Sequence, residues 1–484
     1  MNLQILSPEI ILCGFALLVI LLDLGVKQKG VLAGLSIAGL IVSALAAVSM
    51  WGVPKLAAFG GALVVDQFAI FFKLIIAAAA ILVILASQDY AGKFARFKGE
   101  YYALILLSAV GMMLLVGTTD LIAIYVALEL SSISLYVLAG FLKDQKSTEA
   151  GLKYLLLGAI ASAVLLYGMA MVFGLTGTTR LGEIAMAMQS GQIAPTPALF
   201  MGLVLLASGF GFKIACVPFQ MWVPDVYEGA PTPVTAYLSV ASKAAGFGVI
   251  ARVFFTAFSL PMVLSIDWGI LFAILSAITM TVGNVMALAQ KNVKRLLGYS
   301  SIAQAGYLMV GLASIGMASA NDVLGRSGLL FFMASYALTN LGAFIAIIAI
   351  SQKINSDEID DYAGMGKRSP LLASALSLCL FSLTGLPPTA GLIAKVIIFN
   401  GAVQSGLLWL VIVAVLNTCI SAYYYLKVVK VMWFNPAPSE EKVTSKSWTL
   451  ATALTLACLG VLVFGIIPGP LASFAQAAIK ILVP

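Results

Sequence analysis

The chain has 484 residues, of which 62% are hydrophobic and only 10% are charged, with a formal net charge of +7. Soluble globular proteins carry about 25% charged residues, so this composition excludes a water-soluble enzyme. A membrane-spanning helix takes about 20 residues, and the length therefore predicts an all-α polytopic membrane protein with a dozen or more spans.

Apolar runs separated by polar turns predict fourteen spans. The first is not a cleavable signal, because it contains Glu9 and lacks both a basic start and a small-residue cleavage pattern. No polar interlude is long enough for a soluble domain. The predicted spans lie near residues 7–25, 31–51, 66–87, 101–117, 119–142, 150–176, 198–222, 233–258, 266–289, 295–318, 327–351, 370–402, 404–433 and 448–470.

The loop lysines and arginines predict the orientation. Cytoplasmic loops are enriched in these residues, and an outside N-terminus gives seventeen of them on the cytoplasmic side against four outside. We therefore expect both termini on the outer, periplasmic side, and the basic excess reflects topology instead of nucleic-acid binding. The cytoplasmic set is Lys27, Lys29, Lys93, Arg96, Lys98, Lys143, Lys146, Lys291, Lys294, Arg295, Lys353, Lys367, Arg368, Lys427, Lys430, Lys442 and Lys446, and the outer set is Lys55, Arg180, Arg326 and Lys480.

Histidine is absent and the five cysteines are scattered without CxxC spacing. A His-ligated haem or zinc site is thereby excluded, and neither an iron–sulfur cluster nor a disulfide framework is indicated. We expect the cysteines to be structural and the chain to bind no metal or cofactor of its own.

Three basic residues inside predicted spans have ordinary or open explanations. Lys153 lies near a helix start and Arg252 near a helix end, where long side chains extend to the interface. Lys73 lies about two turns inside its helix, and the sequence does not decide its role.

Four ionisable residues lie deep in predicted spans: Glu129, Lys213, Lys243 and Lys395. Each buried charge costs roughly 2.5–3.5 kcal/mol, so four of them unpaired would cost on the order of 10 kcal/mol. Lysine, unlike arginine, can release its proton when it is desolvated. The set therefore predicts a path for protons or ions, and structural ion pairs between helices are the alternative.

Two spans interrupt their own helical pattern. In the seventh, two glycines precede Lys213 and Pro218 follows it; in the twelfth, Pro387 and Pro388 precede Lys395. Proline removes a backbone hydrogen bond, and the freed carbonyls need polar partners in lipid. We expect both breaks to line a polar cavity.

The breaks also predict an internal repeat. Each is the fourth member of a run of five helices, and an offset of five reverses the orientation, which is typical of inverted repeats in transporters. The expected organisation is N-terminal helices 1–3 in residues 1–100, a first repeat in 101–258, a second, inverted repeat in 266–433, and helix 14 with the C-terminal tail in 448–484.

The stretch GFKIACVPFQMWVPDVYEGAPTPVTAYLSVASKAAGFG, residues 211–248, resembles the signature of the antiporter-like subunits of respiratory complex I. The resemblance covers essentially the whole chain, and it implies fourteen helices with two inverted five-helix repeats and discontinuous helices 7 and 12. Glu129, Lys213, Lys243 and TGLPPTAG followed by Lys395 match family positions. One departure is Gln220, where many relatives have a histidine that can titrate.

Within this family, the chain resembles the N-type branch in three features. These are the stretch DVYEGAPTPV, the length, and Lys395 at the position where the M-type carries Glu. The resemblance implies a proton-translocating subunit in which Glu129 pairs with Lys213 in one state. Disruption of that pair sends charge to Lys243, and Lys395 then relays the proton outward or to the next subunit.

The resemblance further implies partners and location. The partners are an M-type neighbour, small K- and J-type subunits and the lipid bilayer; NAD, FMN, iron–sulfur clusters and quinone belong to partner subunits. The location is the bacterial inner membrane. Three classes remain open: a complex I module, a cation/proton antiporter subunit of the Mrp type or a membrane subunit of an energy-converting hydrogenase, and a scaffold without transport.

Smaller features leave alternatives. Ser300, Ser301, Gln304 and Tyr307 line a water path or form core hydrogen bonds. Asp225 and Glu228, in the loop expected after the broken seventh helix, admit protons or cap helix 8. GMGKRS at 364–369 lacks the first glycine and the preceding strand of a phosphate loop, so we expect a cytoplasmic loop.

Overall fold

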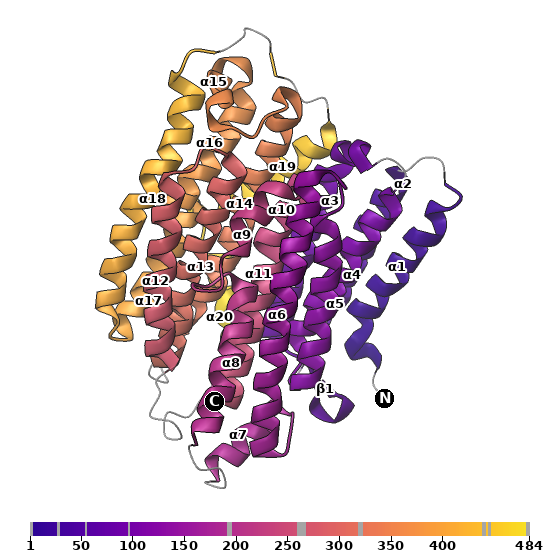
Figure 1. Cartoon of the computed structure of the whole chain (residues 1–484), viewed down its shortest axis with the longest axis vertical. Coiled ribbons are helices and arrows are strands. Elements are labelled where there is room, and N and C mark those ends of the chain that lie inside the picture. The colour runs from indigo at the N-terminus through magenta and orange to yellow at the C-terminus, as the bar shows by residue number, and fades with distance from the viewer. Residues whose placement is uncertain are drawn as a thin grey trace.

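The computed structural model describes residues 3–26, 30–53, 56–94, 97–190, 196–258, 268–317, 323–437, 442–443 and 447–480. Within these ranges the chain is a bundle of helices with one small hairpin (Figure 1). Five of the basic residues used for the orientation lie outside the described residues: Lys27, Lys29, Lys55, Arg96 and Lys446.

The N-terminal part packs three long helices beside the rest of the bundle (Figure 1). A two-stranded antiparallel hairpin, with Leu56 opposite Val65, joins the second helix to the third. The elements are η1 (Leu3–Leu6), α1 (Ser7–Asp23), α2 (Gly30–Val48), β1 (Leu56–Ala58), η2 (Phe59–Gly61), β2 (Leu63–Val65), α3 (Gln67–Tyr90) and η3 (Ala91–Phe94).

The middle part contains the first interrupted helix and a π-helical turn, η4. The elements are α4 (Lys98–Gly117), α5 (Leu121–Ala139), α6 (Gln145–Thr176), α7 (Leu181–Gln189), α8 (Pro197–Ile214), α9 (Trp222–Gly229), α10 (Thr232–Tyr237), η4 (Leu238–Ser242) and α11 (Lys243–Ala257).

The C-terminal part contains the second interrupted helix and ends on a short helix that packs between α3 and α14. The elements are α12 (Trp268–Leu288), α13 (Val293–Met317), α14 (Val323–Ile354), η5 (Ile359–Tyr362), α15 (Met365–Arg368), α16 (Pro370–Thr384), α17 (Ala390–Gln404), α18 (Leu408–Phe434), α19 (Trp448–Ile466) and α20 (Gly469–Ile479).

Among the described residues, thirteen helices are long and apolar enough to cross a membrane, with α10, η4 and α11 counted as one. The expected twelfth span is the pair of shorter apolar helices α16 and α17. All predicted spans therefore fall on helices of the structure.

Side-chain caps fix several helix starts. Asp66, Asp120 and Asp144 each precede a helix and accept hydrogen bonds from its first free backbone amides, at 2.7–3.1 Å. A carboxylate is favourable there because it satisfies those amides and faces the positive end of the helix dipole. These polar residues thus set where α3, α5 and α6 begin.

Burial separates two central helices from a lipid-facing rim. The most apolar stretches of Thr232–Ala257 and Val293–Met317 are fully buried, whereas in α6 and α19 only 28% of the corresponding residues are buried. The rim helices expose large apolar side chains such as Ile160, Leu416 and Leu459. Polar groups on the two central helices are therefore shielded from lipid on every side.

Both predicted breaks occur, and each ends a helix in the left-handed backbone region. Ala215 follows α8 with φ 61°, and Gly385 follows α16 with φ 93°. Glycine adopts this conformation freely, whereas an L-residue with a side chain loses roughly 1–2 kcal/mol. Pro218 and Pro388, each preceded by a cis peptide bond, lie in the two breaks.

The structure corrects the expected end of the seventh span. That span was expected to end near residue 222, but α9 continues it to Gly229. Asp225 and Glu228 therefore lie in the second half of the broken helix and not in a loop. Neither caps the following helix, because Pro231 precedes α10 and that end has no side-chain cap.

Candidate functional site

Lys213 lies in the last turn of α8 and is 4% exposed. Its Nζ donates hydrogen bonds to the side-chain oxygens of Ser132, at 3.0 Å, and Ser131, at 3.5 Å. Both serines are on α5 and also donate to the carbonyl of Leu128. The lysine is thus held by hydroxyl groups of a neighbouring helix.

Glu129 follows Leu128 on α5 and is half-buried. It acts electrostatically on Lys213, but among the described ion pairs no Glu129–Lys213 pair lies within 4.0 Å. Its Oε1 is buried without a hydrogen-bond partner. The two groups therefore interact electrostatically without forming an ion pair within 4.0 Å.

Lys243 begins α11, directly after the π-helical turn η4. Its Nζ donates to the backbone carbonyl of Ser301 and, at 2.6 Å, to the Ser301 hydroxyl. That hydroxyl also lies 3.3 Å from the Tyr227 hydroxyl and 3.0 Å from the Tyr336 hydroxyl. Hydroxyl groups from α9, α13 and α14 therefore meet at Lys243.

Lys395 lies on α17, five residues after the helix begins, and is 4% exposed. Its Nζ donates to the carbonyls of Leu383 and Thr384, at 3.2 and 2.9 Å, and lies 3.4 Å from Thr418 Oγ1. The last carbonyls of a helix lack partners within it and form its negative end. Lys395 thus satisfies carbonyls that the break in the twelfth span leaves free.

Polar side chains lie between Lys243 and Lys395. Ser300, next to Ser301, hydrogen-bonds to the hydroxyl of Tyr425. Gln304, one turn further along α13, contacts that hydroxyl at 3.5 Å and donates to the Leu383 carbonyl at 3.2 Å. Because Lys395 donates to the same carbonyl, hydrogen-bonded polar groups extend from Lys395 to Ser300, but no described hydrogen bond joins Ser300 to Ser301, which holds Lys243.

No comparable connection joins Lys213 to Lys243 among the described hydrogen bonds. Beside Lys213, Phe212 packs on Trp222, with ring centroids 5.4 Å apart, and Gly246 faces the lysine stem. Ser242, adjacent to Lys243, has a buried hydroxyl without a partner. Aromatic rings and isolated hydroxyl groups therefore lie between Lys213 and Lys243, without a described hydrogen-bonded link between the two lysines.

Two further buried ion pairs lie outside this axis. Arg252 forms two hydrogen bonds with Asp66, at 2.8 and 2.9 Å, and Lys73 lies 2.6 Å from Glu9. Arg252 is 2% exposed and meets Asp66 and the Val116 carbonyl inside the bundle, at the start of α3 and the end of α4. Both pairs neutralise charge between helices, as the structural alternative supposes.

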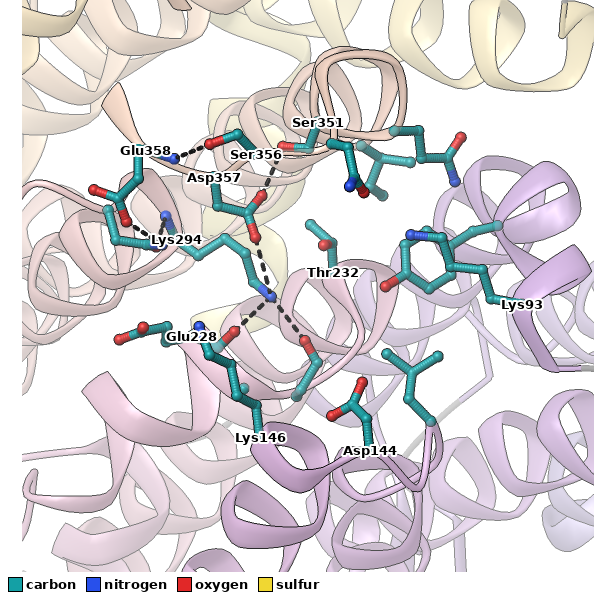
Figure 2. A pocket seen from close by; sticks show the side chains of 18 residues that line it. Lys93, Asp144, Lys146, Glu228, Thr232, Lys294, Ser351, Ser356, Asp357 and Glu358 are labelled. Carbon is teal, nitrogen blue, oxygen red and sulfur yellow. Dashed lines mark hydrogen bonds and ion pairs between the residues drawn. The ribbon is translucent and has the colours of Figure 1, made fainter. Parts of the chain in front are cut away.

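A polar cavity of about 360 Å³ opens at one end of the bundle (Figure 2). Lys294 lies at its centre and donates to the backbone carbonyls of Glu228 and Ala230, at 2.7 and 2.8 Å, while Asp357 lies 3.9 Å away. Nearby, Arg295 pairs with Asp225 and Glu228. Tyr227 is adjacent to Glu228, which lines this cavity, and the Tyr227 hydroxyl lies 3.3 Å from the Ser301 hydroxyl that holds Lys243.

The sequence missed four side chains of this arrangement: Tyr227, Tyr336, Thr418 and Tyr425. Tyrosine in an apolar span is also expected in cores and at membrane interfaces, so Tyr227 and Tyr336 carried no distinct signal. On α18 a signal existed: Thr418, Ser421 and Tyr425 follow helical spacing on one face. Of the sequence-predicted residues, Tyr307 also joins, through its 3.3 Å contact with Thr418.

No group of three or more His, Cys, Asp or Glu residues that could hold a metal ion occurs in the described part of the chain. The ionisable groups that do meet are lysines surrounded by hydroxyls, amides and carbonyls. The hydroxyl groups among them can each donate and accept a hydrogen bond.

Residues 118–421 match the family model described as "NADH:quinone oxidoreductase/Mrp antiporter, TM". A relative from Dehalococcoides mccartyi, named NADH-quinone oxidoreductase subunit N, is 49% identical over 99% of this chain and 100% of its own length. One from Trichlorobacter lovleyi with the same name is 48% identical over 99% of this chain and 98% of its own length.

Solved structures agree with this similarity. A chain of respiratory complex I from Thermus thermophilus has a TM-score of 0.80 and 33% identity, covering 97% of this chain and 99% of that chain. A chain of the Mrp complex from Dietzia has a TM-score of 0.85 at 19% identity, covering 100% of this chain and 98% of that chain, and shows a common fold.

Proposed function

This chain belongs to the family of membrane subunits shared by NADH:quinone oxidoreductases and Mrp antiporters, and from that premise we propose how it translocates protons. It is an N-type membrane subunit of a proton-translocating NADH–quinone oxidoreductase. Full-length relatives at 48–49% identity carry that name, whereas the likeness to the Mrp complex is one of fold.

One observation supports the proposal: hydrogen-bonded polar groups extend from Lys395 to Ser300, next to the Ser301 that holds Lys243, on a helix whose most apolar stretch is fully buried. A proton on Lys243 passes by way of the Ser301 and Ser300 hydroxyls, Tyr425 and Gln304 toward Lys395. Hydroxyl groups suit this role because each can donate and accept a hydrogen bond. The Leu383 carbonyl accepts hydrogen bonds but has no proton to donate, so water carries the proton past it.

Glu129 and Lys213 form the controlled end of the route. Lys213 is held by two serine hydroxyls, and Glu129 has a buried oxygen without a partner. When the carboxylate approaches, the ion pair stabilises the charged lysine; when it withdraws, the lysine passes its proton to Lys243. Because no described hydrogen bond links the two lysines, this transfer takes place only when water enters between them.

Protons enter from the polar cavity around Lys294. Its lining includes the carboxylates Asp144, Glu228 and Asp357, which attract protons from the aqueous side. Tyr227 carries them inward, because it follows this cavity and its hydroxyl lies 3.3 Å from Ser301. Of the two sequence hypotheses for Asp225 and Glu228, proton admission is the one we retain.

The cavity faces the cytoplasm in this proposal, and both termini face the periplasm of a bacterial inner membrane. The excess of loop lysines and arginines supports this orientation, and α1 begins toward the same end of the bundle as α20 (Figure 1). The α4–α11 and α12–α18 segments are inverted repeats, each with its fourth spanning element broken.

Partner subunits provide the redox chemistry. NAD, FMN, iron–sulfur clusters and quinone bind there, and an M-type subunit and small K- and J-type subunits adjoin this chain in the membrane. Quinone reduction alters the neighbouring subunit, and that change moves Glu129 relative to Lys213.

Lys213→Ala in the assembled complex tests the proposal. Proton pumping by this subunit is expected to be lost while NADH oxidation partly survives, measured as the proton-to-electron ratio in proteoliposomes. Lys430→Ala, an exposed lysine on α18, is the control. An unchanged ratio in Lys213→Ala would contradict the assignment.

A further inference from the structure

Two cavities follow one another along the contact between α6 and α9. The first, of about 210 Å³, is lined by charged residues that include Lys146, Lys153, Asp225 and Arg295. The second, of about 190 Å³, is lined almost entirely by apolar side chains, among them Leu157, Ala161, Phe219 and Trp222. Together they form a groove with a charged head and an apolar tail.

The helix spacing makes this groove continuous. On α6, residues 146, 150, 153, 157, 161 and 164 recur every three or four positions and share one face. On α9 the apolar Trp222 is followed one turn later by Asp225 and then by Glu228. The change from charged to apolar lining therefore occurs at the same level on both helices.

The dimensions fit one leaflet of a bilayer. Fifteen residues separate Lys146 from Ala161, which is about 22 Å along a helix. Half of a bilayer, including the headgroup region, is about 20–22 Å thick. If Lys146 lies at the level of lipid phosphates, the apolar cavity lies near the bilayer midplane, where acyl chains end.

The charges leave one cation without a partner. Lys153 pairs with Glu149 and Asp225, and Arg295 pairs with Asp225 and Glu228. Lys146 is exposed and forms no ion pair with any residue that the structure describes. The head of the groove has three cations and three carboxylates, and among the cations Lys146 alone lacks a described ion pair, so its ammonium group is free to bind a phosphate.

We propose that the α6–α9 groove binds one membrane phospholipid, with its phosphate at Lys146 and an acyl chain in the apolar cavity beside Pro218 and Phe219. The bound chain packs against the break of the seventh span. This site uses none of the axis lysines, although its charged head shares Lys146 and Glu228 with the polar cavity around Lys294.

Photo-crosslinking tests the site in the intact complex. The complex is placed in nanodiscs of phosphatidylethanolamine and phosphatidylglycerol that contain a phosphatidylethanolamine with a diazirine in mid-chain. Adducts are mapped by peptide mass spectrometry. We expect adducts on residues 157–164 and 218–222 to exceed those on the exposed face of α19 at Leu456 and Leu459.

Two variants distinguish a built site from ordinary lipid contact. Lys146→Ala should lower labelling of the groove about fivefold, as expected for the loss of a lysine that contributes about 1 kcal/mol near lipid phosphates. Ala161→Trp should abolish it by filling the cavity, and Lys430→Ala should not change it. The proposal would be overturned if the groove and α19 were labelled equally, or if the groove were not labelled because another subunit covers it. Unchanged labelling of the groove in Lys146→Ala would also overturn it.

Discussion

Lys213 and Lys395 both lie beside a break in a membrane helix, yet their partners differ. Lys395 donates to the backbone carbonyls of Leu383 and Thr384, whereas Lys213 donates to the side-chain hydroxyls of Ser131 and Ser132. Side chains on a helix lean toward its N-terminus. Lys395 follows its break and leans back toward it, while Lys213 precedes its break and leans away.

This difference in hydrogen-bond partners suggests different roles for Lys213 and Lys395 in the proposed route. Backbone carbonyls at the end of α16 are fixed, so Lys395 has a permanent set of acceptors, and hydrogen-bonded groups extend from it to Ser300. Serine hydroxyls rotate and Glu129 has an unpartnered buried oxygen, so the surroundings of Lys213 can change. The Lys213 end is therefore the part of the molecule suited to control, and the Lys395 end the part suited to conduction.

Tyr425→Phe tests the part of the route between Lys243 and Lys395, and we expect it to have the largest effect of these variants. The substitution removes the hydroxyl shared by Ser300 and Gln304. A positioned proton-transfer group contributes roughly 10²–10⁴-fold in rate, so we expect proton transfer to slow about 100-fold. It is measured as the initial rate of internal acidification in inverted vesicles oxidising NADH.

Tyr423→Phe is the matched control, because Tyr423 is on the same helix but 66% exposed on the opposite, lipid-facing side. Its acidification rate should equal that of the unmodified complex. Equal rates for both variants would show that protons do not use the Tyr425 hydroxyl.

Glu129→Gln sharpens the comparison at the other end. The amide keeps the shape of the carboxylate but removes the charge that acts on Lys213. With an effective dielectric constant near 20, charges several ångströms apart interact by roughly 2 kcal/mol, so coupled turnover should fall about 10- to 30-fold. Steady-state NADH:quinone turnover reports it, and Glu149→Gln, an exposed carboxylate on α6, should have no effect.

Gly385→Ala tests whether the second break must be fixed, and its effect should be the smallest. Alanine is unfavourable by about 1–2 kcal/mol at φ 93°, and its Cβ would lie 3.1 Å from Cδ of Lys395. We expect a several-fold loss of pumping and a lower thermal inactivation temperature. Gly174→Ala, which has open space at its Cβ position, should change neither.

The sequence predicted the membrane class and the span positions because each span must be apolar and long enough to cross the bilayer. It also located both breaks, since proline within an apolar span cannot continue a helix. It failed at the end of the seventh span, where WVPDVYEG reads as a polar loop but forms α9 against Arg295 and Lys153. Tertiary ion pairs there override the local pattern.

The sequence predicted the charged residues of the candidate site but not the polar side chains that lie between them. A charge inside lipid is costly enough to be noticed in a sequence, so Glu129, Lys213, Lys243 and Lys395 were identified. The connecting hydroxyl of Tyr425 carries no such cost, because tyrosine packs readily in an apolar core. The Arg252–Asp66 pair was not predicted either, since the two residues lie far apart in the sequence.

The most direct test of the account is the proton-to-electron ratio of a complex that carries Lys243→Met. Methionine preserves length and packing but can neither hold a proton nor donate to Ser301, where the two halves of the route meet. The account predicts that NADH continues to reduce quinone in proteoliposomes while the ratio falls by the share of this subunit. A ratio equal to that of the unmodified complex would contradict it.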